Sequence, residues 1–100
     1  MSGRNLRVGI VGVGWGALVH APAFDVVDGY VVEAICSRRL ESVRAAAEKL
    51  GIGDVSTEWR EFVRRDDLDL ISISSPVAMH RSMLIEALQA GKHVLCSRNV

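Results

Sequence analysis

The sequence is poor in the residues that mark several large classes of protein. Only two of its 100 residues are cysteine, Cys36 and Cys96. Two cysteines so far apart make neither a disulfide framework nor a metal-binding pattern. We therefore expect no metal site. Each cysteine ends a predicted strand, and we expect both to be small, buried and reduced.

An excess of charge of one sign is also missing. The chain has 12 basic and 12 acidic residues, a formal net charge of zero and 5% aromatic residues. Proteins that bind nucleic acids usually present a strongly basic face, and the chain has no block of lysine or arginine. The composition therefore argues against nucleic acid as a partner.

Long hydrophobic runs are absent as well. Residues 1–23 superficially resemble a signal peptide, because Arg4 and Arg7 precede an apolar stretch and Ala21-Pro22-Ala23 resembles a cleavage site. Three glycines interrupt that stretch, however. No apolar run approaches the roughly 18 residues that a membrane-spanning helix needs. We therefore expect a cytoplasmic protein with no membrane partner.

What the chain does contain is a regular alternation of strand-like and helix-like segments, which suits one domain over residues 1–100. Apolar β-branched runs predict five strands, at Leu6–Val11, Tyr30–Cys36, Val55–Thr57, Leu68–Ser74 and Lys92–Cys96. Helices are predicted between them, at Gly16–Val27, Leu40–Leu50, Trp59–Arg64 and Met79–Ala90. This alternation favours an α/β fold of Rossmann type. Its doubly wound parallel sheet usually has the order 3-2-1-4-5-6, so the sixth strand would be missing.

Local signals predict where the helices begin and end. Ser37 is a candidate cap for the second helix, and Ser75-Pro76 supplies a capping hydroxyl and an N-terminal proline for the fourth. Gly51 and Gly91 directly follow the second and fourth predicted helices, at the position where a residue in the left-handed conformation commonly caps a helix C-terminus. Pro22 would kink or shorten the first helix, because proline removes a hydrogen bond and clashes with the preceding turn.

A glycine-rich turn directly follows the first predicted strand. It reads Gly12-Val13-Gly14-Trp15-Gly16-Ala17 and precedes a predicted helix. In a dinucleotide-binding loop, Gly12 would permit the tight turn, Gly14 would let the backbone approach a pyrophosphate, and Ala17 would let the helix pack closely. A turn that merely joins a strand to a helix is the alternative. The position after a β-branched run favours phosphate binding.

The end of the second predicted strand bears on the choice between NAD and NADP. An acid about twenty residues beyond the glycines would bind the ribose diol, whereas arginine would attract a 2'-phosphate. Glu33 has nearly the right spacing but lies in the middle of the strand, and the strand end carries Ser37, Arg38 and Arg39 instead. We therefore expect NADP, with NAD as the alternative. For Arg39, simple solvation at the start of the helix is an equally good explanation.

A further candidate segment, residues 74–80, follows the fourth predicted strand. It lies beside the switch point of the strand order, where ligands of open α/β sheets bind. We therefore expect Ser74, Ser75 and Pro76 to contact the central part of the cofactor. His80 is a candidate for the nicotinamide side, and a solvent-facing histidine in the first helical turn is the alternative.

Five separated segments of the chain form a more specific pattern. They read GIVGVGWGALVHAPAF, AICSRR, STEWREF, SISSPVAMH and ALQAGKHVLC. In this order and spacing they resemble the N-terminal domain of the glucose-fructose oxidoreductase, inositol dehydrogenase and MocA (Gfo/Idh/MocA) family. The resemblance implies a Rossmann domain that binds NAD or NADP, with hydride transfer to or from sugars, polyols and related compounds. It also implies a larger second α/β domain that holds the substrate and mediates homo-oligomerisation, so the 100-residue chain is expected to be an inactive fragment.

The chain departs from the family's pattern at two places. Pro76-Val77 stands where the family often has two prolines, which is a mild change. Ser97-Arg98-Asn99 stands where the family typically has Glu-Lys-Pro, and the resemblance assigns that lysine to substrate binding and proton transfer. Arg98 is therefore the candidate catalytic residue. A guanidinium can orient a hydroxyl or a carbonyl, but it cannot act as a general acid or base near neutral pH.

Several explanations of this end of the chain stay open. The first is that the chain is a family member with changed or lost chemistry. The second is that it is a truncated product, and the third is that its last codons are read out of frame. A non-catalytic dinucleotide-binding or sensor module is the alternative function. A methyltransferase with a doubly wound fold is disfavoured. Such a protein would need an acidic residue at the end of the second strand, where this chain has Cys36-Ser37. An unpaired fifth strand would be an exposed edge, so self-association is expected.

Overall fold

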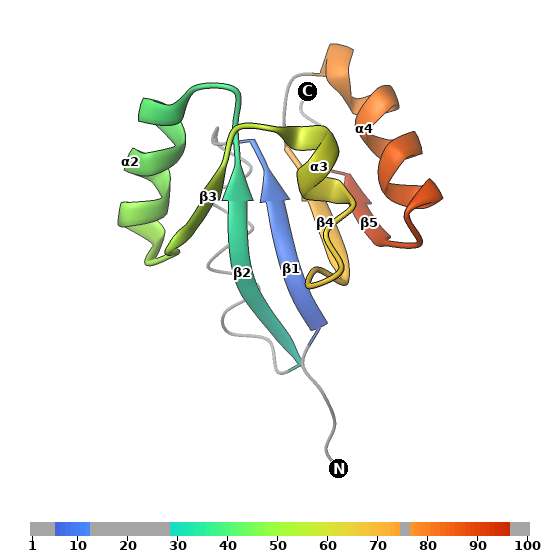
Figure 1. Ribbon diagram of the computed structural model, residues 1–100, viewed down its shortest axis with the longest axis horizontal. Coiled ribbons are helices and arrows are strands. Elements are labelled where there is room, and N and C mark those ends of the chain that lie inside the picture. Colours follow the sequence, from blue (N-terminus) through green and yellow to red (C-terminus); the bar gives the residue numbers. More distant parts are fainter. Residues whose placement is uncertain (1–5, 13–28, 75–76, 97–100) are drawn as a thin grey trace.

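The computed structural model describes residues 6–12, 29–74 and 77–96, and it shows a parallel sheet with helices packed against it (Figure 1). The strands are β1 (Leu6–Val11), β2 (Tyr30–Cys36), β3 (Asp54–Ser56), β4 (Leu70–Ile73) and β5 (His93–Cys96). The helices are α2 (Leu40–Leu50), α3 (Trp59–Val63) and α4 (Val77–Gln89). The helix predicted at residues 16–27 lies outside the described residues.

The strand order is β3-β2-β1-β4-β5, and every pair of neighbours is parallel. The chain runs outward from β1 to β3 and then crosses back to β4 on the other side of β1. This reversal creates a switch point between β1 and β4. The predicted Rossmann-type α/β fold with a doubly wound parallel sheet is confirmed.

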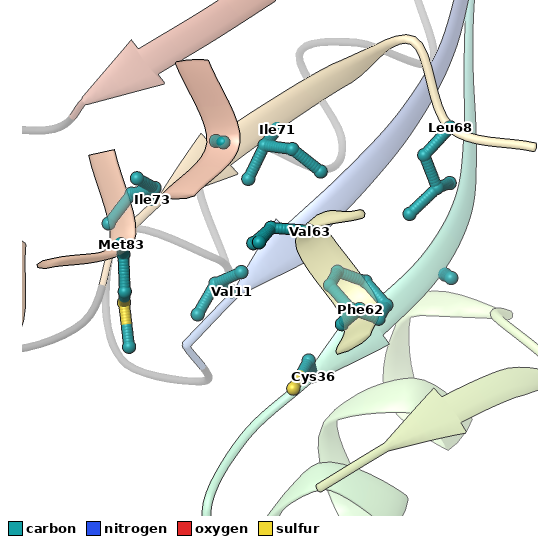
Figure 2. Close-up of a cluster of buried hydrophobic side chains, with 10 residues drawn as sticks. Val11, Cys36, Phe62, Val63, Leu68, Ile71, Ile73 and Met83 are labelled. Atoms are coloured by element: carbon teal, nitrogen blue, oxygen red, sulfur yellow. The ribbon is translucent and has the colours of Figure 1, made fainter. Parts of the chain in front are cut away.

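The alternation of side chains along the strands builds two cores, one on each face of the sheet. On one face, Val8, Ile10 and Ile35 pack against Val43 and Ala47 of α2. The other core is formed by β-strand residues together with α3 and α4, and Figure 2 shows part of it: Val11, Cys36, Phe62, Val63, Leu68, Ile71, Ile73 and Met83. The strands are therefore covered on both sides, as a parallel sheet requires.

The predicted bounds of β1, β2 and α2 agree with the structure, and the other described elements differ from prediction by one or two residues. The interpretation of Ser37 as a helix cap is wrong. The N-cap residue of α2 is Arg39, with φ −110° and ψ 123°, and no side chain caps this helix. Gly51 is the left-handed C-cap as predicted, with φ 74°, and Gly91 likewise has a positive φ of 80°.

The register between β1 and β2 shifts in the middle of the pair. Val8 pairs with Val32 and Gly9 pairs with Ala34, so Glu33 is an extra residue in β2. Its side chain is exposed, and it lies well before the strand end. The extra residue bends the strand locally. Beyond the shift, Val11 at the end of β1 pairs with Cys36 at the end of β2.

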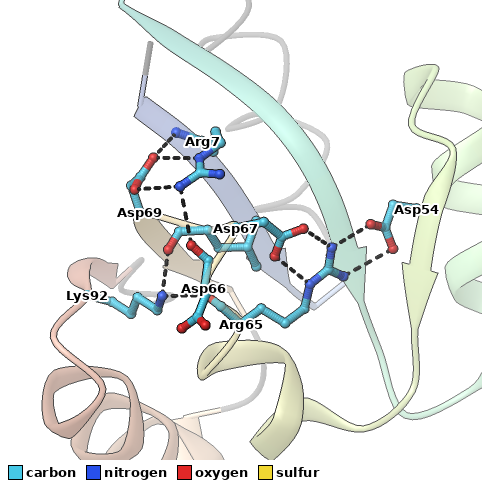
Figure 3. A network of polar contacts seen from close by, with 8 residues as sticks. Arg7, Asp54, Arg65, Asp66, Asp67, Asp69 and Lys92 are labelled. Carbon is cyan, nitrogen blue, oxygen red and sulfur yellow. Dashed lines mark hydrogen bonds and ion pairs between the residues drawn. The ribbon is translucent and has the colours of Figure 1, made fainter. Parts of the chain in front are cut away.

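Ion pairs tie the amino-terminal ends of the strands together (Figure 3). Arg7 of β1 donates to the Asp69 carboxylate, with N···O distances of 3.0 and 3.2 Å. Arg65, after α3, donates to both carboxylate oxygens of Asp54 at the start of β3 and to both of Asp67. The two arginines thus link β1 and β3 to the loop that leads into β4.

Lys92, in the turn before β5, makes further hydrogen bonds at the same edge of the sheet. Its ammonium group donates to the carbonyl oxygens of Arg65 and Leu68, the latter at 2.6 Å. Charges at this end of the sheet are therefore engaged in holding loops together. Among the described helices, none has the length and apolar character needed to cross a membrane.

Candidate functional site

Backbone hydrogen bonds join the carboxyl-terminal ends of four strands. The Gly12 amide donates to the Cys36 carbonyl at 2.7 Å, and the Ser37 amide donates to the Ser56 carbonyl at 3.1 Å. On the other side of β1, the Ser74 amide donates to the Val11 carbonyl at 2.8 Å. The structure therefore brings the predicted site residues Gly12, Ser37 and Ser74 to one edge of the sheet.

Gly12 directly follows β1 and has a φ of 111°, in the region that side chains disfavour. This agrees with the prediction that the first glycine of the motif permits a tight turn. The remaining predicted residues of the loop, Val13, Gly14, Trp15, Gly16 and Ala17, lie outside the described residues.

Ser74 follows β4 at the switch point, and its side chain is buried. Its hydroxyl donates to the Val11 carbonyl at 3.1 Å, in addition to the bond from its amide. The hydroxyl proton is therefore engaged in joining β4 to β1, so toward a ligand this hydroxyl could act only as an acceptor, through its oxygen lone pairs. Ser75 and Pro76 lie outside the described residues. His80 lies in the first turn of α4, but its side chain is not described.

The turn after β2 carries the positive charge of the site. Arg38 and Arg39 are both exposed, and their guanidinium groups make no hydrogen bond or ion pair to another residue in the described part of the chain. Arg7 and Arg65, at the opposite edge, are engaged with carboxylates. The arginines at the carboxyl-terminal edge therefore have no carboxylate partner among the described residues, and the acids of this region are Glu41 in the first turn of α2 and Glu58, whose charge acts on Cys36.

Cys36 lies beneath this turn, fully buried in the apolar cluster of Figure 2. Burial raises the pKa of its thiol to about 11, and a hydrogen bond with the Ser56 side chain offsets part of that shift. The thiol is thus protonated near neutral pH. Cys36 is the small, buried, free cysteine that was predicted. Within the described ranges, no three histidine, cysteine or acidic side chains gather as metal ligands would.

Sequence reasoning missed Ser56, which joins the end of β3 to the end of β2. Its hydroxyl oxygen accepts a hydrogen bond from the Glu58 amide at 3.1 Å. Serine followed by a short polar turn was the available signal, since serine hydroxyls often bond to the backbone two residues on. The partners Ser37 and Cys36 are about twenty residues away in sequence, so only the sheet reveals them.

Comparison with known families gives a match over nearly the whole chain. The model described as "Oxidoreductase family, NAD-binding Rossmann fold" matches residues 6–98. Arg98 is the last residue of the matched range, and it lies outside the described residues.

Among curated proteins, the chain is 38% identical over 96 residues to dTDP-3,4-didehydro-2,6-dideoxy-alpha-D-glucose 3-reductase of Streptomyces violaceoruber. The match covers 95% of this chain and 28% of the reductase. The chain therefore spans less than a third of the length of this relative.

Solved structures resemble the fold closely. Scyllo-inositol dehydrogenase from Lactobacillus casei, with bound NAD(H) and scyllo-inositol, has a TM-score of 0.83 and 29% identity, covering 93% of this chain and 28% of that one. Biliverdin reductase from Synechocystis, in complex with biliverdin and NADP+, has a TM-score of 0.87 and 26% identity, covering 94% of this chain and 29% of that one. These similar proteins thus include both an NAD and an NADP complex.

Proposed function

The chain belongs to the Gfo/Idh/MocA family of oxidoreductases with an NAD-binding Rossmann fold, and from that premise we propose that its carboxyl-terminal sheet edge binds NADP in preference to NAD. We further propose that the chain is the nucleotide-binding part of an oxidoreductase that works with a second, substrate-holding domain. The substrate class is a sugar, a polyol or a related compound, as the reductase and the inositol dehydrogenase suggest. Full-length members would be homo-oligomers.

The observation that carries the NADP preference is the pair of unengaged guanidinium groups at the end of β2. Arg38 and Arg39 are exposed and follow Ser37 directly, and residues 36–39 at this strand end include no acid, although the Glu58 carboxylate acts on Cys36 from the turn after β3. A guanidinium fork matches the geometry of phosphate oxygens. One such bond contributes about 1.5–3 kcal/mol, which corresponds to roughly 10- to 150-fold in affinity.

Each predicted residue has a role along the bound dinucleotide. Residues 12–17 would hold the pyrophosphate, with the backbone amides that follow Gly12 at the start of a helix, where the helix dipole favours negative charge. Ser37 and Arg38, with Arg39 beside them, would bind the 2'-phosphate. Residues 74–76 would contact the central part, and His80 would lie on the nicotinamide side. The fit rests on Gly12, whose φ of 111° and missing Cβ suit a close backbone approach.

The bound nicotinamide would supply the site that accepts or gives up a hydride. Near it, Arg98 would orient a substrate oxygen without exchanging its proton, because the guanidinium stays charged throughout the neutral range. A proton would then have to reach the substrate from another group. This limit keeps the non-catalytic binding or sensor module as the second candidate function.

Calorimetric titration of the chain with NADPH and NADH tests the cofactor assignment. We expect tighter binding of NADPH, and Arg38→Ala should weaken NADPH binding by about 10- to 100-fold while changing NADH binding by less than about twofold. Arg44→Ala, an exposed arginine on α2, is the matched control and should change neither affinity. Arg39→Ala shows whether the second arginine also contacts the phosphate. Equal affinities, or tighter binding of NADH, would overturn the NADP preference.

Catalysis is tested by fusing the chain to the substrate domain of the similar 3-reductase. Turnover by an Arg98→Lys fusion but not by the Arg98 fusion would support the interpretation that this chain has lost the general acid that a lysine at position 98 would provide. Turnover by both would show that Arg98 suffices and would exclude the non-catalytic module.

A further inference from the structure

The turn that joins β3 to α3 crosses the carboxyl-terminal edge of the sheet. In the strand order, β2 separates β3 from β1. Helix α3 nevertheless packs on β1, because the ring of Phe62 lies directly against Gly9. Only Thr57 and Glu58 stand between the last residue of β3 and the first residue of α3. This short turn therefore has to pass the end of β2, and Figure 1 shows it running past that strand end toward α3.

Hydrogen bonds hold this turn beside the residues that leave β2. The Ser37 amide donates to the backbone carbonyl of Ser56 at 3.1 Å, and the Glu58 amide donates to the side-chain oxygen of the same serine at 3.1 Å. Two such bonds and the width of one residue put the backbones of Ser37 and Glu58 no more than about 10 Å apart. The arginines that follow Ser37 and the carboxylate of Glu58 therefore leave the sheet from neighbouring points of one edge.

The carboxylate of Glu58 carries a charge that no neighbour neutralises. Its side chain is exposed and makes no hydrogen bond or ion pair within the described part of the chain. The adjacent Arg60 is engaged elsewhere, since its guanidinium lies 4.9 Å from the centre of the Trp59 ring and 3.8 Å from the Glu86 carboxylate. Burial is the main cause of the raised pKa of Cys36, and the charge of Glu58 adds to it. The field of this carboxylate thus reaches the end of β2.

A negative charge at this edge distinguishes NADP from NAD. The two dinucleotides differ only in the 2'-phosphate, which carries close to two negative charges at neutral pH where NAD has an uncharged hydroxyl. Charges about 10 Å apart near a protein surface still repel measurably, and salt screens this repulsion. A carboxylate here therefore weakens the binding of NADP and leaves that of NAD nearly unchanged.

We infer that Glu58 is a specificity-determining residue: its carboxylate, brought to the end of β2 by the turn after β3, opposes the 2'-phosphate and limits the NADP preference that Arg38 and Arg39 confer. This inference rests on the proposed binding of NADP. It makes the preference a balance between charges on two turns, which come from two different strands.

Replacement of Glu58 by glutamine removes the charge and keeps the shape of the side chain. In about 0.01 M salt, where the screening length is about 30 Å, we expect Glu58→Gln to tighten NADPH binding by about three- to tenfold and to change NADH binding by less than about twofold. In about 1 M salt, where the screening length is about 3 Å, the gain should disappear. Glu48→Gln, at an exposed glutamate of α2, is the matched control and should change neither affinity.

The outcomes separate this inference from the proposed function. A wild-type chain that prefers NADPH, with no gain in Glu58→Gln, would overturn the role of Glu58 alone. Weaker NADH binding in Glu58→Gln would overturn it too, because the carboxylate would then be bonded to the ribose diol. A wild-type chain that prefers NADH, but gains NADPH affinity in Glu58→Gln, would overturn only the proposed preference. Binding of neither dinucleotide would overturn both.

Discussion

Gly9 and Phe62 are packed so closely that β1 has no room for a side chain at position 9. An ideal Cβ on Gly9 would lie 2.9 Å from Cε2 of Phe62 and 2.6 Å from Cδ1 of Leu68. Phe62 belongs to α3 and is buried, and Leu68 stands beside it in the core shown in Figure 2. The missing side chain of Gly9 thus allows α3 to lie directly on the central strand.

Gly9→Ala is therefore expected to destabilise the chain. Forcing a methyl group into a close-packed core costs about 1–3 kcal/mol, because the ring of Phe62 or the backbone must move. Urea denaturation of both proteins measures the difference. Gly53→Ala is the matched control, since nothing lies within 4 Å of its Cβ position, and it should change stability by less than about 0.5 kcal/mol. Equal effects of the two substitutions would contradict the packing argument.

Gly12→Ala should impair both folding and dinucleotide binding. A side chain at φ 111° is strained by about 1–3 kcal/mol, and relief of that strain would move the loop after β1. Gly51→Ala is the matched control, because it also imposes a side chain at positive φ, 74°, but at the far end of α2. Denaturation should show a loss of stability in both variants. Titration with NADPH should show weaker binding in Gly12→Ala alone.

The ion pair between Arg7 and Asp69 predicts a specific dependence of stability on pH. The hydrogen bonds from Arg7 hold the pKa of Asp69 at about 2, below its value of about 3.9 in an unfolded chain. A carboxylate with a lowered folded-state pKa stabilises the fold above the unfolded pKa, and this contribution is lost as the pH falls toward the folded pKa. The stability difference between wild type and Asp69→Asn should therefore be constant above about pH 5 and shrink between about pH 5 and 2.

Urea denaturation over this pH range measures the Asp69 contribution. Asp66→Asn serves as the control, because Asp66 contributes only its backbone carbonyl to the Arg7 network. It should show no comparable pH-dependent difference from wild type. A stability difference for Asp69→Asn that stayed constant down to about pH 2 would contradict the low pKa of this carboxylate.

The open edge of β5 predicts concentration-dependent self-association. Within the described part of the sheet, β5 pairs with β4 alone, and the side chain of Leu95 is 42% exposed. An open strand edge with an apolar side chain is a template for pairing, and lysine on an edge strand suppresses it. Light scattering at high concentration should therefore show association that Leu95→Lys reduces. Leu40→Lys, at a leucine of α2 that is 47% exposed, should not reduce it, and a monodisperse wild-type monomer would contradict the prediction.

The accuracy of the sequence-based predictions followed the strength of the local signals. The bounds of β1, β2 and α2 were predicted correctly, because long apolar patterns define them and Gly51 ends the helix. The start of β4 was predicted two residues early. Leu68 is apolar and buried, but its amide bonds to the Arg65 carbonyl in a turn, and an apolar pattern does not distinguish the two.

Ser37 is the clearest error, because its local signal was real but competed with a tertiary contact. A serine three residues before a helix invites a capping assignment. The amide of Ser37 instead bonds to Ser56 of β3, and α2 begins at Leu40 with Arg39 as its N-cap. Ser37 does lie at the carboxyl-terminal edge of the sheet, where the cofactor is predicted to bind. Its contact with a phosphate stays a prediction.

The sequence by itself determined the order of strands and helices, the glycines after β1 and the arginines after β2, because periodicity and residue chemistry are local properties. The tertiary structure alone decided the register that puts Cys36 level with Val11, and the packing that makes a side chain at Gly9 intolerable. It also decided the contact between Ser37 and Ser56. The physical reason is that parallel strands pair residues twenty or more positions apart, and their alignment depends on the whole sheet and the helices packed on it.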